Sequence, residues 1–152
     1  MIKWIRQIVW GKVLLVGFLY TIIASIIRQI ESIIMMSYYS SEVYRGVWNK
    51  LLMPTVGPRQ FEFFVNYLIA TFLTGVSLCI IYYYLKSYLP KKKWERTFYF
   101  ADVLVATSFV FFTIPVYILF NVPIALLGSW FLSTFVSVVS ASLLIVHILP
   151  EK

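Results

Sequence analysis

The stretch Ile124–Leu149, IALLGSWFLSTFVSVVSASLLIVHIL, decides the fold class because it contains no Asp, Glu, Lys or Arg. A helix that crosses a membrane needs about 20 mostly apolar residues, and this stretch is long enough. Three further stretches have the same character, at about 8–36, 63–85 and 98–120. Because lipid offers no partners to backbone polar groups, each stretch is predicted to be a helix. The sequence therefore predicts an all-α integral membrane protein, a four-helix bundle forming one domain, 1–152.

The overall composition agrees with this class. Of the 152 residues, 61% are hydrophobic and 12% are charged, whereas a soluble domain carries about 25% charged residues. The net charge of +7 indicates orientation, because Lys and Arg gather on the cytoplasmic side of membrane proteins. The basic loop 86–96 is therefore predicted to be cytoplasmic, and four spans then place both termini there. We expect a multi-pass protein of the cell membrane that binds no nucleic acid.

The connection between the first two spans contains a short amphipathic pattern. Between residues 41 and 52 apolar side chains recur at helical spacing, with polar side chains on the other face. This predicts a short helix lying in the outer membrane interface, and docking of a partner protein is the alternative. Its apolar positions are Val43, Tyr44, Val47, Trp48, Leu51 and Leu52.

Two charged residues interrupt the first span. Arg28 lies 16 residues after Lys12, about 24 Å of helix, so both side chains can reach the edges of a hydrocarbon core about 30 Å thick. In this interpretation the span ends at Arg28, and Glu31 pairs with it one turn later. If the helix instead continues to Met36, the pair faces the bundle interior, where ionisable groups are rare and usually functional. Asn66 could complete a small outer polar cluster.

Asp102 is the inner counterpart, about one turn into the third span. The nearest cations expected at that face are Lys12, Lys93 and Arg96. An interfacial salt bridge is the favoured interpretation, and a proton relay is the alternative.

Small residues recur in two spans at the spacing that allows close helix approach. We expect these faces to pack together or against another chain, and a hydroxyl-lined conduit is the alternative. Pro115 is expected to kink the third span. The small residues are Ser129, Ser133, Ser137 and Ala141 in the last span, and Ala70, Thr74 and Gly75 in the second.

Signatures of catalysis and of metal binding are absent from the sequence. His147 is the only histidine and Cys79 the only cysteine, so neither a zinc ligand set nor a nucleophile with its base is expected. No cofactor is expected, although a lipid or a quinone could bind between helices without a motif. The sequence favours a non-catalytic membrane subunit within a larger membrane protein complex, whose partners are lipids and other subunits or itself. The alternative is a small homo-oligomeric transporter or channel using Arg28, Glu31 and Asp102.

Overall fold

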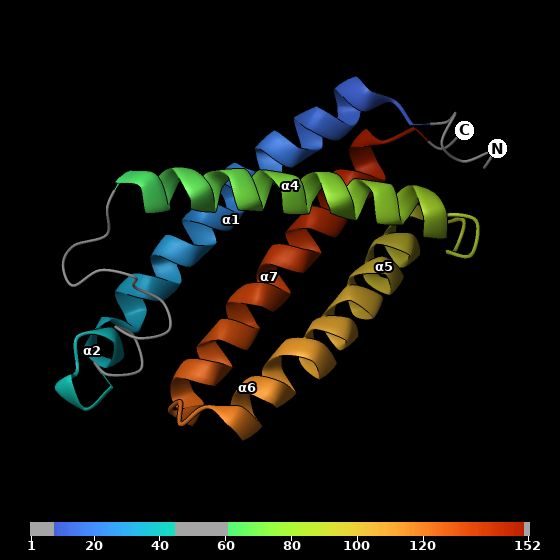
Figure 1. Ribbon diagram of the computed structural model, residues 1–152. Helices are drawn as coiled ribbons and strands as arrows, with labels where there is room; N and C mark the ends of the chain where they lie inside the picture. Colours follow the sequence, from blue (N-terminus) through green and yellow to red (C-terminus); the bar gives the residue numbers. More distant parts are fainter. Residues whose placement is uncertain (1–7, 45–60, 151–152) are drawn as a thin grey trace.

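The computed structural model describes residues 8–44 and 61–150, and these ranges are almost entirely helical (Figure 1). They contain four helices long and apolar enough to cross a membrane. The all-α class and the four spans are thereby confirmed. The elements are α1 (Trp10–Ile34), α2 (Met36–Tyr39), the 3-10 turn η2 (Glu42–Tyr44), α4 (Phe61–Leu85), α5 (Lys93–Ser108), the π-helical η3 (Phe109–Thr113), α6 (Ile114–Leu119) and α7 (Ile124–Ile148).

The third span begins earlier than the predicted residue 98, because its basic residues are helical. Helix α5 starts at Lys93, directly after the extended residue Lys92. Arg96 is buried and donates from Nε to the Pro90 carbonyl at 2.8 Å and from Nη2 to the Lys91 carbonyl at 3.0 Å. These bonds fold the loop back onto the first turn of α5, so the charged residues extend the helix.

The predicted interfacial helix 41–52 is described only at its start. The structure shows the 3-10 turn Glu42–Tyr44 there, with Val43 exposed. The remaining apolar positions, Val47, Trp48, Leu51 and Leu52, lie outside the described residues. The amphipathic helix therefore stays a prediction.

The irregularity expected at Pro115 takes the form of a π-helical segment. Proline has no N–H and its ring clashes with the carbonyl four residues earlier, so a regular α-helix cannot pass through it unchanged. Segment η3 lies just before Pro115 and widens the helix there. The run α5–η3–α6 thereby continues as one span, Lys93–Leu119.

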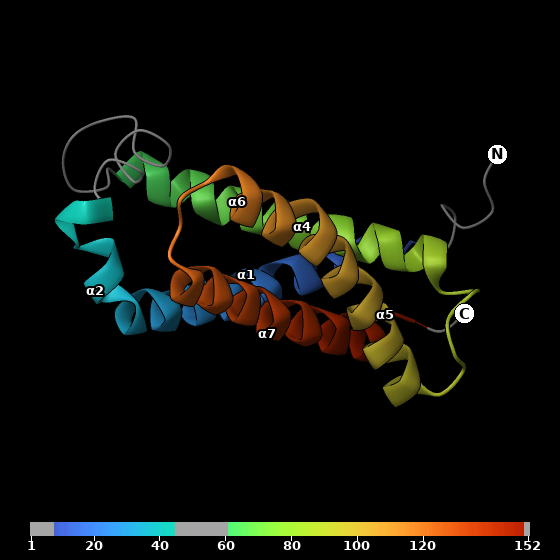
Figure 2. The same ribbon diagram turned by 90° about the horizontal axis from the view of Figure 1, so that it is seen from below.

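Helices α1 and α7 form the centre of the arrangement. Helix α1 packs against both α4 and α7, and α7 packs in turn against α5. Figure 2 shows α1 and α7 side by side in one layer, with α4 lying across them in a second layer. Helices α4 and α5 each have one main neighbour, so much of their apolar surface is exposed.

The apolar core lies toward one end of the bundle. There the start of α1 meets the ends of α4 and α7 (Figure 1). The Val9 N–H donates to the Tyr83 hydroxyl at 3.3 Å, and Lys86 Nζ donates to the Pro150 carbonyl at 3.4 Å. This end also carries the basic loop and is called the basic end below. The fully buried core side chains there include Val13, Val16, Cys79, Tyr82, Phe100, Ile145 and Val146.

The contact between α1 and α4 depends on two glycines. A Cβ atom added to Gly75 would lie 3.0 Å from the Cα of Gly17 and 3.0 Å from Cδ1 of Tyr20. One added to Gly17 would lie 3.0 Å from Cγ2 of Val76. The two helices therefore approach until their backbones touch, as small residues allow in membranes.

We predict that Gly75→Ala destabilises the protein, because the new methyl group meets backbone atoms that cannot move aside. Overpacking of this kind costs about 1–3 kcal/mol. Gly128→Ala is the matched control, since nothing lies within 4 Å of its added Cβ. That change should be neutral or stabilise α7 by up to about 1 kcal/mol through helix propensity. Thermal unfolding in detergent micelles measures both variants, and equal midpoints would contradict the packing argument.

Candidate functional site

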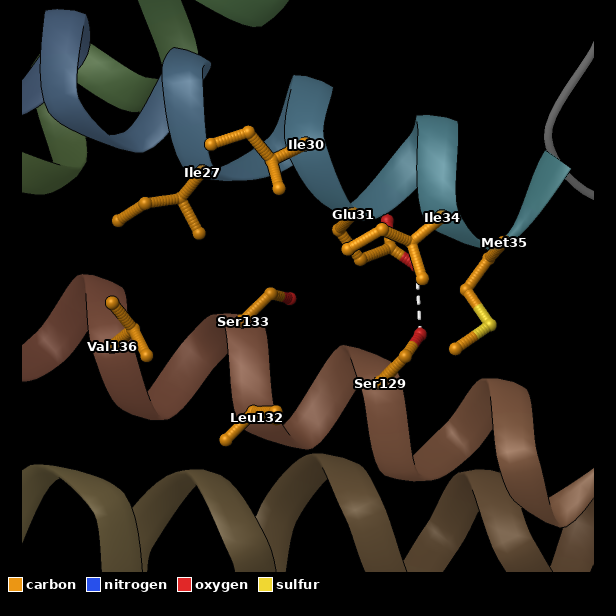
Figure 3. Close-up of a pocket in the computed structure, with 9 residues that line it drawn as sticks. All are labelled: Ile27, Ile30, Glu31, Ile34, Met35, Ser129, Leu132, Ser133 and Val136. Carbon is orange, nitrogen blue, oxygen red and sulfur yellow. Dashed lines mark hydrogen bonds between the residues drawn. The ribbon is translucent and has the colours of Figure 1, made fainter.

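A buried carboxylate joins α1 to α7 at the end opposite the basic end. Glu31 is 7% exposed. It accepts a hydrogen bond from Ser129 Oγ at 2.8 Å (Figure 3), and from the Tyr39 hydroxyl at 3.1 Å to Oε1 and 3.4 Å to Oε2. Trp130 Nε1 donates in turn to the Tyr39 hydroxyl. One carboxylate thus holds together α1, α2 and α7.

The second charge of the pair is held more loosely. Arg28 Nη1 lies 3.5 Å from Glu31 Oε2 and 3.4 Å from Ser133 Oγ. Direct charge-assisted N–H···O bonds are usually about 2.7–2.9 Å long, so both contacts of the guanidinium are long. The Arg28 side chain is 47% exposed, in contrast to its buried partner.

The pair lies within continuous helix. Helix α1 passes through both residues and ends at Ile34, so the helix does not stop at Arg28. Met35 then interrupts the helix before α2 begins. Ser133, which meets Arg28, lies in the interior of α7. Arg28 therefore contacts a neighbouring helix, and the position of the pair relative to the membrane edge stays a prediction.

Arg28 and Glu31 line two different hollows. Glu31 lies at the edge of a pocket of about 270 Å³ between α1 and α7, otherwise lined by aliphatic side chains, Met35 and two serines (Figure 3). Arg28 lines a hollow of about 300 Å³ between α1, α4 and α7, called the Arg28 cavity below. Ser133 borders both. The polar lining of the Arg28 cavity includes Tyr20, Arg28, Tyr67, Thr71, Ser133 and Ser137.

Tyr39 acts as a protonated donor in this cluster. Its burial raises the pKa of the phenol above the ordinary value, the bond from Trp130 lowers it, and the nearby Glu31 carboxylate raises it further. The phenol therefore keeps its proton at neutral pH and donates a hydrogen bond to Glu31. Because its oxygen also accepts a hydrogen bond from Trp130, the Tyr39 hydroxyl links α7 to α1.

Two residues expected near this cluster are placed elsewhere. Asn66 is exposed on α4 and has no hydrogen bond to Arg28 or Glu31, so its expected role in the cluster is wrong. The following residue, Tyr67, turns toward α1 and lines the Arg28 cavity instead. Helical geometry explains the difference, because adjacent residues lie about 100° apart around the axis.

Asp102 does not form the expected interfacial salt bridge. It is exposed on α5 and pairs with no cation among the described residues. The buried Arg96 is instead directed to the loop carbonyls and to the Tyr82 hydroxyl, which accepts from Nη1 at 3.3 Å. Asp102 faces a shallow groove between α5 and α7, whose lining includes Phe98, Tyr99, Phe135 and Val139.

The small residues of α7 divide between contacts and cavities. Ser133 and Ala141 are buried, while Ser129 and Ser137 are partly buried. This face meets α1 more than α4, since α7 packs mainly on α1 and α5. Of the three small residues expected to pack in α4, Gly75 is buried at a helix contact, whereas Ala70 and Thr74 are exposed and line the Arg28 cavity.

The remaining residues considered for chemistry lie at the basic end. Cys79 is fully buried in the core. His147 Nδ1 donates to the Leu143 carbonyl at 2.9 Å, and its ring lies edge-on to Trp94. Within 8–44 and 61–150 no three His, Cys, Asp or Glu side chains gather at metal-binding distance.

Tyrosine and tryptophan side chains of the site were missed by the sequence argument. Tyr39 lies eight residues after Glu31, beyond a break in the helix, so spacing alone does not pair them. Trp130, Tyr20 and Tyr67 come from three different helices. Only the helix register brings them to the charged pair, although a tyrosine in the interior of an apolar span is a signal that its hydroxyl needs a partner.

Comparison with protein-family models, with curated proteins and with solved structures finds no match to this chain. The fold and the site indicate a multi-pass helical membrane protein with a buried polar cluster around Glu31.

We predict that Tyr39→Phe weakens the α1–α7 contact, because Glu31 loses a donor and Trp130 loses its acceptor. Side-chain hydrogen bonds between membrane helices are worth about 0.6–1.7 kcal/mol, and the free energy of unfolding should fall by that amount. Tyr117→Phe is the matched control, since Tyr117 is exposed and makes no hydrogen bond with the described residues. Unfolding in mixed micelles measures both, and a loss shared by the two variants would contradict the assignment.

Proposed function

We propose that the chain is a non-catalytic integral membrane subunit that packs within a larger membrane protein complex. The observation that carries the proposal is the exposed carboxylate of Asp102 on α5. The exposed apolar faces of α4 and α5, each with one main neighbour, support it.

The depth of Asp102 argues for a partner. It lies nine residues after Lys93, where α5 begins, which corresponds to about 14 Å of helix. Its groove is shared with Phe135 and Val139, which lie near the middle of α7. The carboxylate thus lies about a third of the way along the span Lys93–Leu119, beyond the basic loop.

The energy of a lone charge at this depth favours pairing. A carboxylate at the centre of a membrane helix disfavours insertion by about 2.5–3.5 kcal/mol on translocon scales, and this figure is an upper limit for Asp102, which lies before the centre. Intramembrane charges usually face a partner or a water-filled cavity. A neighbouring helix that carries Lys or Arg at this depth, seated in the groove of about 320 Å³ between α5 and α7, would remove this cost.

The orientation of the chain is part of the proposal. The α4–α5 connection and the start of α5 carry Lys91, Lys92 and Lys93. By the positive-inside rule this end lies on the cytoplasmic side of a cell membrane. Because the start of α1 and the end of α7 lie at the same end, both chain termini are assigned to the cytoplasmic side.

The surroundings of Ser129 and Glu31 support a non-catalytic role. Ser129 donates to a carboxylate, but His147, the only histidine of the chain, belongs to the opposite end of α7. The cluster around Glu31 is satisfied by its own members, as a structural link between helices requires.

A small homo-oligomeric transporter or channel is the second candidate, and the two hollows on either side of Ser133 favour it. Arg28 lines one and Glu31 lines the other, so the pair separates two openings. A path of this kind would use Arg28 and Glu31, while Asp102 lines neither hollow.

The test is purification of the tagged native protein in mild detergent, with mass spectrometry of co-eluting chains. We predict a stoichiometric membrane partner that carries a basic residue within a span. Asp102→Asn should lower its occupancy about tenfold, which corresponds to about 1.4 kcal/mol of lost pairing. Glu95→Gln is the matched control, since it removes an acidic charge from the same helix at an exposed pair with Lys92.

The outcomes separate the two candidates. A wild-type protein that elutes alone would contradict the subunit proposal, and a partner retained equally by both variants would contradict the pairing role of Asp102. Ion or small-cation flux in liposomes that Glu31→Gln abolishes, with the variant still folded, would support the transporter in its place.

A further inference from the structure

We propose that the Arg28 cavity binds the anionic head of an amphiphile, a carboxylate or a phosphate, with its acyl chain lying along α4. This inference goes beyond the proposed function and does not depend on a partner at Asp102. It rests on which polar groups of the cavity are already bonded and which are not.

Three small hydroxyl groups of the cavity have used their protons. Thr71 donates to the Tyr67 carbonyl at 2.8 Å, Ser133 to the Trp130 carbonyl at 3.0 Å, and Ser137 to the Ser133 carbonyl at 2.8 Å. The donor of each of these groups is bonded to a carbonyl of its own helix and is not available to a ligand.

Arg28, Tyr20 and Tyr67 keep donor groups that have no partner among the described residues. The Nε and Nη2 atoms of Arg28 bond to no described residue, because both of its contacts are made through Nη1. The hydroxyls of Tyr20 and Tyr67, which line the same cavity, also bond to no described residue. A guanidinium edge and two phenols thus face one hollow between apolar helices. Such an arrangement is complementary to a group that carries several acceptor oxygens.

The Arg28 guanidinium is not closely paired with the Glu31 carboxylate. That carboxylate already accepts from Ser129 at 2.8 Å and from Tyr39 at 3.1 Å, and it lies 3.5 Å from the guanidinium. It borders the opposite pocket, and none of the described acidic side chains lines the Arg28 cavity. An anion in the cavity would therefore face the guanidinium without an acidic side chain beside it. It can accept two parallel hydrogen bonds from Arg28.

The walls and the mouth of the cavity indicate an amphiphile. Ala24, Ala70 and Val138 contribute apolar wall, and the exposure of Ala70 and Thr74 leaves the cavity open along α4. A volume of about 300 Å³ is at the lower end of ligand pockets and exceeds the roughly 30 Å³ share of one water molecule. Arg28 lies six residues before the end of α1, about 9 Å of helix. A headgroup from the leaflet on the α2 side can reach it.

The experiment uses the full-length protein, purified in mild detergent and depleted of lipid, with binding followed by native mass spectrometry and by thermal shift. The probes are phosphatidylglycerol, phosphatidylcholine, oleate, a quinone and inorganic phosphate. We expect phosphatidylglycerol or oleate to bind at least tenfold more tightly than phosphatidylcholine. Arg28→Gln should abolish this preference, and the double variant Tyr20→Phe/Tyr67→Phe should reduce it several-fold.

Lys12→Gln is the matched control, since it removes one positive charge from the same helix at a residue outside the cavity. It should bind as the wild type does. The tyrosine variant keeps the test decisive if Arg28→Gln fails to fold, because it removes only two hydroxyl groups.

Four results would overturn the proposal. The first is equal binding of phosphatidylglycerol and phosphatidylcholine, and the second is an equal loss in the Arg28 and Lys12 variants. The third is Arg28-dependent binding of inorganic phosphate without binding of either amphiphile, which would assign the cavity to a soluble anion. The fourth is preferential binding of the quinone, which would assign the cavity to a neutral acceptor.

Discussion

The buried carboxylate of Glu31 is the constraint on which the end opposite the basic end depends. A charged group enclosed between apolar helices must have its acceptor capacity filled, because an unpaired one would favour separation of the helices. Ser129 on α7 and Tyr39 on α2 fill it, with Arg28 close by. These donors exist only when α1 and α7 have one relative rotation and one relative height. The carboxylate therefore specifies a register that aliphatic packing alone would leave weakly defined.

The two ends of the bundle are stabilised by different kinds of interaction. At the basic end, Tyr82, Phe100 and Ile145 are buried in a continuous apolar core, and Arg96 is bonded to loop carbonyls. Between the ends, Gly17 and Gly75 bring α1 and α4 into backbone contact. Dispersion and shape dominate there, since lipid provides no hydrophobic drive for helix association. Charge and hydrogen bonding dominate around Glu31.

The face on which each charge lies connects structure to function. Glu31 is enclosed, Arg28 borders an open cavity on the α4 side, and Asp102 faces a separate groove beside α5. The enclosed charge is bonded by groups of its own chain, Ser129 and Tyr39. The two partly open charges, of opposite sign, are the positions where a lipid or a neighbouring chain would complete the molecule.

The sequence by itself determined the class of protein, because four long apolar stretches admit only helices in a membrane. It also identified Arg28, Glu31 and Asp102 as the residues that need an explanation, since a charge in an apolar span is conspicuous without any structure. It missed Tyr20, Tyr39, Tyr67 and Trp130, and it paired Asp102 and Asn66 wrongly. Partners on different helices depend on rotation and height, which apolar spans encode only weakly because many side chains fit lipid equally well. The tertiary structure decided those pairings, and with them which charges are enclosed and which remain open.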